Sequence, residues 1–148
     1  MPKTQAKQKK KNNMSVWTWV GIGMVVVVAV ALVYFLIPRQ GAGAMPAEIS
    51  VSDAYAKRDA GAFILDVRQP EEWDQVHIPG ATLIPLGELQ SRLSEVPSDQ
   101  EVVVVCRSGN RSQEGRNILK NAGYEQVTSM AGGVNQWQAA GYPTVSGP

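Results

Sequence analysis

A lone cysteine stands at the start of a short segment rich in groups that can bind anions. Cys106 is the only thiol in the 148 residues and begins the run Cys106-Arg107-Ser108-Gly109-Asn110-Arg111. Because glycine and asparagine tolerate positive φ, we expect a tight loop whose backbone N–H groups turn inward as an anion-binding nest. Two arginines and the N-terminus of a helix expected near Ser112 would favour a thiolate over a thiol. The segment therefore predicts a nucleophilic cysteine that faces an anionic substrate.

The element before this loop indicates where the cysteine lies. Residues 101–105 form the run Glu-Val-Val-Val-Val, which is typical of a strand buried on both faces at the centre of a parallel sheet. In such sheets, ligands bind beyond the carboxyl ends of the strands. Cys106 follows that end directly. This position favours a reactive role over the alternative, in which a lone cysteine serves as a small buried hydrophobe.

Strands and helices alternate along residues 47–145. The expected strands are 48–51, 63–67, 81–84, 101–105 and 127–130. The expected helices cover 52–60 with Ser52 as N-cap, a short segment from Pro70, then 86–96, 112–122 and 134–140. This alternation predicts an α/β domain with a mainly parallel sheet of about five strands and helices on both faces, which makes three α/β/α layers.

The N-terminal region has a different character. No residue from Asn12 to Pro38 is charged, and the 21 residues 17–37 would form a helix of about 31 Å at ~1.5 Å per residue, the thickness of a bilayer core. This predicts one transmembrane helix over residues 17–37. One alternative is a buried core helix. Another is a cleaved signal peptide, since Ala42-Gly43-Ala44 fits a cleavage site after Ala44, but the apolar region exceeds the 7–15 residues usual for such peptides.

Charge around this span predicts its orientation. Five lysines lie in residues 1–16 and a single arginine, Arg39, follows the span closely, so the basic tail 1–16 is expected in the cytoplasm and the body outside. Residues 38–46 are rich in Gly and Ala and suit a linker. The lysine run could also bind nucleic acid. A topology signal is favoured because the run adjoins the span, and residues 38–148 carry nine basic against thirteen acidic side chains, which argues against nucleic acid as a partner.

Four motifs in order resemble the single-domain rhodanese family over residues 47–145. They are Leu65-Asp66-Val67-Arg68 followed by Glu71-Glu72-Trp73, then His77-Ile78-Pro79-Gly80-Ala81, the Cys106–Arg111 loop, and Gly132-Gly133-Val134 with Trp137. The resemblance implies a rhodanese-like fold and a sulfurtransferase that carries sulfur as a persulfide on Cys106. It implies a small anionic donor such as thiosulfate, a thiol or cyanide acceptor, and no metal or organic cofactor.

The resemblance also implies roles for individual residues. Cys106 would be the nucleophile, and Arg111 would close the loop and point inward, so that its loss is expected to matter more than that of Arg107. Asp66 and Arg68 would support the loop, with Arg68 paired to Glu71 or Glu72. Substrate contacts would come from Arg107, Ser108, Gly109, Asn110 and Arg111, those of Ser108 and Asn110 mainly through backbone N–H groups. Packing is the favoured role of His77, Trp73 and Trp137.

Loop length separates the function classes that share this fold. The six residues from Cys106 to Arg111 match the size associated with sulfurtransferases, whereas the related phosphatases and arsenate reductases have seven. A single cysteine excludes an intrachain disulfide, and one histidine excludes a His-rich metal cluster. The expected function is thus a membrane-anchored sulfurtransferase. The loop does not distinguish it from a persulfide carrier dedicated to one partner protein.

Overall fold

The computed structural model describes residues 45–148. The predicted basic tail, the predicted membrane helix and residues 38–44 of the predicted linker lie outside the described residues, and these three assignments stay predictions. Among residues 45–148, no helix is long and apolar enough to cross a membrane.

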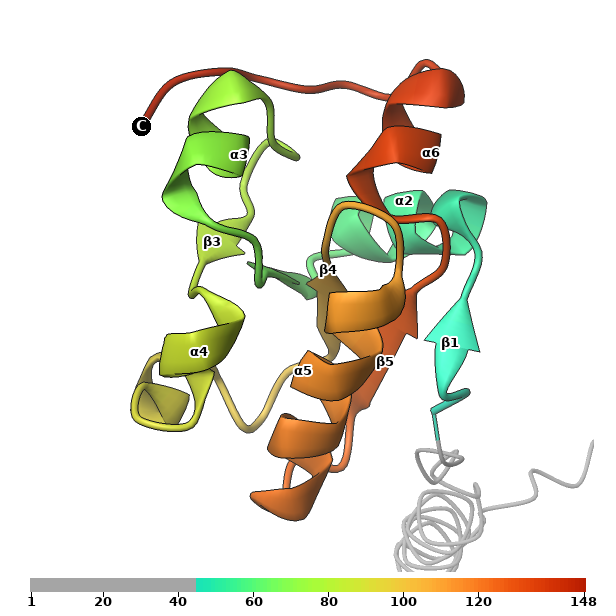
Figure 1. The fold of residues 1–148 in the computed structure, drawn as a ribbon. Helices are drawn as coiled ribbons and strands as arrows, with labels where there is room; N and C mark the ends of the chain where they lie inside the picture. The colour runs from blue at the N-terminus through green and yellow to red at the C-terminus, as the bar shows by residue number, and fades with distance from the viewer. Residues whose placement is uncertain (1–44) are drawn as a thin grey trace, which may run out of the picture. The chain divides into compact units, whose positions relative to one another are not determined.

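Five parallel strands form one sheet, as the alternating pattern predicts (Figure 1). The strands are β1 Glu48–Ile49, β2 Phe63–Asp66, β3 Thr82–Leu83, β4 Val102–Val105 and β5 Val127–Met130. Their spatial order is β1-β5-β4-β2-β3, so the valine-rich strand β4 is central. Its four residues are fully buried, which explains why the sequence there is apolar on both faces.

Helices cover both faces of the sheet and complete the predicted three layers (Figure 1). The helices are α2 Val51–Asp59, α3 Pro70–Gln75, α4 Leu86–Leu89, α5 Asn110–Asn121 and α6 Gly133–Ala139. Along β4, Val103 and Val105 belong to the core cluster under α2 and α6, whereas Val102 and Val104 belong to the cluster under α4 and α5.

Several predicted boundaries are wrong in detail. The first strand ends at Ile49, and Ser50 rather than Ser52 caps α2, because the Ser50 hydroxyl accepts the Asp53 N–H at 3.1 Å. The predicted helix 86–96 is instead α4 followed by a 3₁₀ turn, η1, over Leu93–Glu95. Between them the Ser91 hydroxyl donates to the Glu88 carbonyl at 2.8 Å, a local bond that competes with continuation of the helix.

The sheet brings together the two segments that matter for the site. Asp66 of β2 lies opposite Val105 of β4, and the Val67 N–H donates to the Val105 carbonyl at 3.0 Å. The chain leaving β2 and the chain leaving β4 therefore run side by side. The chain continues from β2 to β3 on one side of the sheet and from β4 to β5 on the other side. The crevice between the carboxyl ends of β2 and β4 is therefore a topological switch point, where ligands bind in open α/β sheets.

Candidate active site

The Cys106 sulfur lies beneath the start of α5. Cys106 follows β4 directly, and its side chain is 1% exposed and packed in the core cluster under α4 and α5. The Gly109 N–H donates to Sγ at 3.1 Å. Since α5 begins at the next residue, the positive end of its dipole also faces this region. The Gly109 N–H and the end of the helix thus both present positive partial charge to the sulfur.

The loop takes the expected tight form, but its glycine and asparagine differ. Gly109 has a φ of 108°, a backbone conformation that L side chains rarely adopt. No residue other than glycine has a positive φ within residues 45–148, so of the two residues that tolerate this conformation only Gly109 adopts it. Asn110 is instead the first residue of α5, which starts two residues earlier than predicted. The side chains of Ser108 and Asn110 are exposed.

Ser112 is a site residue that the sequence reasoning missed. Its fully buried hydroxyl accepts the Cys106 S–H at 3.7 Å and donates to the Gly109 carbonyl at 2.7 Å. It thereby links the sulfur to the backbone of the loop that holds it. The sequence feature that could have indicated this role is a serine directly after Arg111. In the first turn of the helix, such a hydroxyl can face back toward the preceding strand.

The N-terminus of α6 fixes the first two residues of the loop. The Val134 N–H donates to the Cys106 carbonyl at 2.8 Å, and the Asn135 N–H donates to the Arg107 carbonyl at 3.1 Å. The backbones are so close that a Cβ on Gly133 would lie 2.3 Å from the Cys106 carbonyl oxygen. The motif Gly132-Gly133-Val134 is thus explained by a close approach of two backbones.

Asp66 and Arg68 form a buried pair beside the loop. The Asp66 carboxylate is fully buried and the Arg68 side chain is 3% exposed, and their charged atoms approach to 2.7 Å. Arg68 also donates to the carbonyls of Glu72 and Val76 at 3.3 and 2.8 Å. The predicted pairing of Arg68 with the carboxylate of Glu71 or Glu72 is therefore wrong. A carboxylate buried as deeply as that of Asp66 needs a cation as its partner. Arg68, which lies two residues further along the same chain segment, provides that cation.

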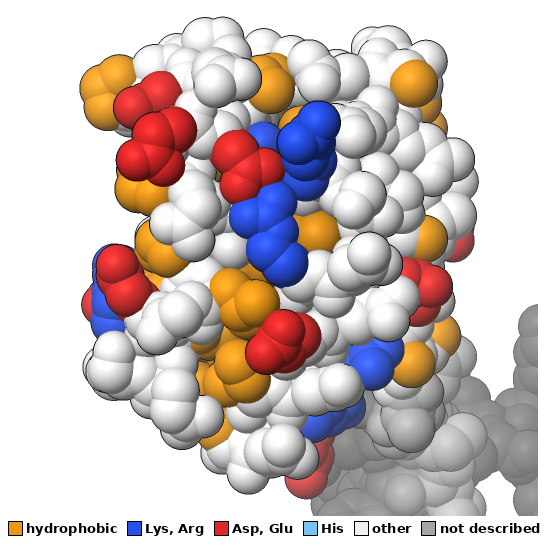
Figure 2. Space-filling view, viewed as in Figure 1, with side chains coloured by type: hydrophobic (Ala, Val, Ile, Leu, Met, Phe, Trp, Pro, Cys, Tyr) orange, Lys and Arg blue, Asp and Glu red, His pale blue; other side chains and the backbone are white. Residues whose placement is uncertain are grey.

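Arg111 pairs with a carboxylate from α3. Its two terminal nitrogens donate to the two Glu72 oxygens at 2.7 and 2.8 Å, the bidentate geometry that arginine favours. Hydrogen bonds from Arg111 lower the pKa of the Glu72 carboxyl from 4.5 to about 2, and the same bonds raise the pKa of Arg111. Acidic and basic side chains lie in contact on this face (Figure 2). The guanidinium expected to point inward is thus already bound to the protein.

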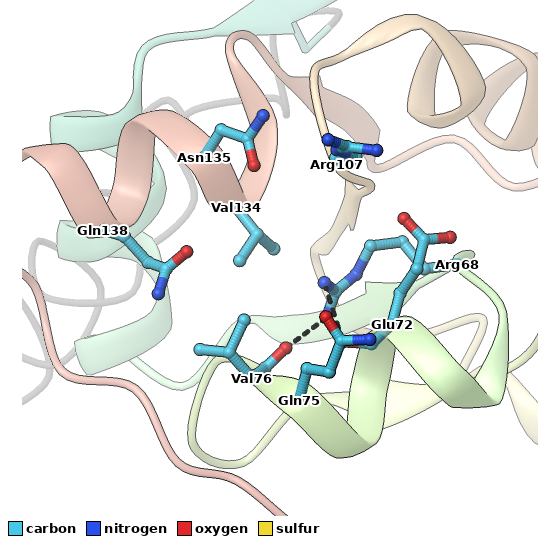
Figure 3. A pocket seen from close by; sticks show the side chains of 8 residues that line it. All are labelled: Arg68, Glu72, Gln75, Val76, Arg107, Val134, Asn135 and Gln138. Atoms are coloured by element: carbon cyan, nitrogen blue, oxygen red, sulfur yellow. Dashed lines mark hydrogen bonds between the residues drawn. The ribbon is translucent and has the colours of Figure 1, made fainter.

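Arg107 differs from Arg111 in its surroundings. The side chain is exposed and makes no ion pair with any residue of the described range 45–148. It lines a pocket of about 310 Å³ between α3 and α6, next to the loop (Figure 3). Of the two predicted cations, Arg107 is the one available to an anionic ligand.

The aromatic residues of the motifs serve packing. Trp137 is fully buried in the cluster under α2 and α6, and its indole N–H donates to the Pro143 carbonyl at 2.8 Å. The His77 ring stacks on Trp73 with centroids 3.6 Å apart, and its Nδ1 lies 3.1 Å from the Trp73 carbonyl. Within residues 45–148, no group of three or more His, Cys, Asp or Glu could hold a metal ion.

Comparison with known proteins agrees with this geometry. The chain is 39% identical over 84 residues to a sulfurtransferase of Allochromatium vinosum (57% of this chain, 78% of that protein). It is 35% identical over 101 residues to the thiosulfate sulfurtransferase GlpE of Pseudomonas syringae (67% and 94%). It is 36% identical over 101 residues to YrkF of Bacillus subtilis, a candidate sulfur carrier protein, of which it spans about half (66% and 54%).

A solved structure and a family model point the same way. A rhodanese-related protein from Thermoplasma volcanium superposes with a TM-score of 0.63 at 31% identity, covering 68% of this chain and 98% of that one. The model of the rhodanese-like domain matches residues 50–140, which include both β2 and the Cys106 loop. The chain therefore belongs to the rhodanese-like family.

Proposed function

We propose that this chain is a membrane-anchored sulfurtransferase that moves sulfane sulfur from thiosulfate or a similar anionic donor to a thiol or cyanide through a persulfide on Cys106. The observation that carries the proposal is the position of the sulfur, which receives the Gly109 N–H at the N-terminal end of α5. Names of relatives support it, because two of them are called sulfurtransferases.

The first step loads the sulfur. The Cys106 thiolate attacks the outer sulfur of thiosulfate, the new S–S bond forms as the old one breaks, and sulfite leaves with the electron pair. Arg107 lines the pocket beside the loop, has no charged partner in the described part of the chain, and would hold the sulfonate end of the donor. Backbone N–H groups of Ser108, Gly109 and Asn110 would complete the cradle.

The second step transfers the sulfur from Cys106 to the acceptor. An acceptor thiolate or cyanide attacks the outer sulfur of the persulfide, the S–S bond to Cys106 breaks, and Cys106 regains its thiolate. The electron pairs balance within these two displacements, so the cycle requires neither a second cysteine nor a metal or organic cofactor.

The membrane anchor belongs to the proposal as well. Residues 17–37 would span the cell membrane once, with the tail 1–16 in the cytoplasm and residues 47–145 outside, joined by the linker 38–46. Cysteine labelling would test the orientation. In a Cys106→Ser/Asp99→Cys variant, which moves the thiol to an exposed position, an impermeant maleimide should label intact cells. Labelling only after lysis would show that the domain lies on the cytoplasmic side, opposite to the proposed orientation.

A carrier dedicated to one partner protein is the second candidate, and the similarity to YrkF favours keeping it. Steady-state turnover of thiosulfate and cyanide by the full-length protein in detergent separates the two functions. Sustained turnover that Cys106→Ser abolishes would support the enzyme. A protein that loads one sulfur but barely turns over would support the carrier, and a protein that does neither would contradict both.

A further inference from the structure

Helix α3 carries Glu72 to the Cys106 loop but has little packing of its own. It has six residues, and none of its side chains is buried. A helix this short is not stable by itself, so contacts with the rest of the domain must fix its position. The Glu72 carboxylate is held at the start of the helix, because its Oε2 accepts the Gln69 N–H at 3.3 Å. The carboxylate therefore moves with α3, and its pair with Arg111 depends on what holds α3 in place.

A segment that follows α6 holds the end of α3. Figure 1 shows the chain running from the end of α6 across to α3. We call residues 145–147 the strap. The Gly147 N–H donates to the Asp74 carbonyl at 2.9 Å, and the Ser146 hydroxyl donates to the Gln75 carbonyl at 2.8 Å. The last carbonyls of a helix have no partner within the helix, so the strap supplies hydrogen bonds that α3 itself cannot make.

The strap is rooted in the core at its start and lies at the surface further on. Just before it, the Pro143 carbonyl accepts the indole N–H of the fully buried Trp137 at 2.8 Å. Val145 and His77 then exchange two backbone hydrogen bonds, of 2.8 and 2.9 Å, yet the Val145 side chain is 43% exposed. Because the strap holds α3 through hydrogen bonds with little apolar burial, it can open locally while the core stays folded.

A further link to α3 comes from the interior. The buried Arg68 guanidinium donates to the carbonyls of Glu72 and Val76 at 3.3 and 2.8 Å. These carbonyls differ from the two that the strap holds. Loss of the strap would therefore loosen α3 without detaching it from the domain.

The partner of Glu72 is a cation close to the sulfur. Arg111 is the second residue of α5, and its side chain is 33% exposed. Hydrogen bonds from Glu72 are the main cause that raises the pKa of Arg111, and the charge of Cys106 contributes to the same shift. The guanidinium thus lies within electrostatic range of the sulfur. Separated from Glu72, it would be a second cation beside Arg107 for an anionic donor.

Resting on the proposed function, we infer that the strap keeps Glu72 paired with Arg111, and that release of the strap frees Arg111 to bind the sulfonate end of the donor. With the strap in place, Arg107 is the cation that meets the donor. With the strap released, both arginines meet it. The strap residues are positioning residues, because they act through α3 and do not touch the donor.

Shortening the chain tests this inference in the full-length protein in detergent. A chain that ends after Thr144 lacks the strap but keeps Pro143. The matched control ends after Gly147, which removes only the exposed Pro148. We expect the amides of residues 71–77 to exchange hydrogen faster in the strapless chain alone. Its KM for thiosulfate in the loading of Cys106 should fall about fivefold, whereas simple loss of structure would not tighten donor binding.

A double-mutant cycle shows whether the strap acts through Glu72. Glu72→Gln should lower the KM as much as removal of the strap does, and the two changes together should lower it no further. In the strapless chain, Arg111→Ala should raise the KM as much as Arg107→Ala does. Additive effects of Glu72→Gln and strap removal would overturn the inference.

A point substitution covers the case in which the shortened chain does not fold. Ser146→Ala removes one strap hydrogen bond at the surface and should produce the same two changes to a smaller extent. Ser94→Ala, at another exposed serine, should produce neither. Unchanged hydrogen exchange, or faster exchange without a lower KM, would overturn the inference and leave the proposed function standing. A wild-type protein that does not load sulfur would overturn the proposed function and this inference with it.

Discussion

Two helices begin beside Cys106, and they contact different parts of the same residue. At the start of α5, the Gly109 N–H reaches the sulfur and Ser112 links that sulfur to the loop backbone. At the start of α6, the Val134 N–H reaches the Cys106 carbonyl. One helix acts on the reacting atom and the other on the path of the chain. Charge at the sulfur and shape of the loop should therefore respond to different substitutions.

The largest effect is expected on the α6 side, from Gly133→Ala. The new Cβ would lie 2.3 Å from the Cys106 carbonyl oxygen, so the loop must move, and thiosulfate turnover should fall more than about a hundredfold. Gly141→Ala is the matched control: its φ of +75° carries a similar backbone strain, yet nothing lies within 4 Å of its Cβ. Equal activity of the two alanine variants would show that α6 does not set the loop's shape.

Arg107→Ala comes next. It removes a cation that has no charged partner within residues 45–148. We expect the KM for thiosulfate to rise about ten- to a hundredfold with a smaller change in kcat, because a charge-assisted contact contributes roughly 1.5–3 kcal/mol. Arg111→Ala should raise that KM less, because Arg111 already pairs with Glu72. The reverse order would show that Arg111 leaves Glu72 to bind the donor.

On the α5 side, Ser112→Ala should slow persulfide formation about five- to tenfold. It removes the hydroxyl next to the sulfur and leaves the Gly109 carbonyl without that donor. The free energy of unfolding should therefore also fall by about 1–3 kcal/mol. Ser129→Ala is the control, since this buried hydroxyl donates to the Ala47 carbonyl at 3.0 Å. Loss of stability with unchanged loading rate would make Ser112 purely structural.

The smallest effect concerns the pair between α3 and α5. Because the pKa of Glu72 is about 2 when folded and 4.5 ordinarily, its stabilising effect is complete above pH 4.5 and disappears as the pH falls toward 2. After a discount for solvent screening we expect a loss of ~1–2 kcal/mol in the free energy of unfolding over that window. Glu72→Gln should flatten this pH dependence. Identical acid unfolding curves for wild type and variant would contradict it.

The sequence predicts the position of Cys106 because strand β4 and its neighbours follow local rules. Four buried valines in a row and alternating helices suffice for a parallel sheet, and in that sheet the carboxyl ends of the strands share an edge. The N-cap of α2 lies two residues before the predicted one, because Ser50 and Ser52 are equally good caps by type. The geometry around Asp53 decides between them.

Long-range contacts of the site lay beyond local rules. Arg111 and Glu72 are 39 positions apart, and the sequence offers several acids to each arginine. Gly133 stands out as part of a motif, but only the fold shows that its backbone lies against Cys106. Likewise, the pairing of Arg68 with Asp66 rather than with Glu72 follows from how deeply the Asp66 carboxylate is buried.

Intact mass spectrometry shows whether Cys106 carries the transferred sulfur. The full-length protein in detergent is treated with thiosulfate, freed of excess reagent and weighed before and after addition of a reductant. We expect wild type to gain the mass of one sulfur atom and to lose it on reduction, while Cys106→Ser gains none. An equal gain in the serine variant, or no gain in wild type, would show that Cys106 does not carry the sulfur.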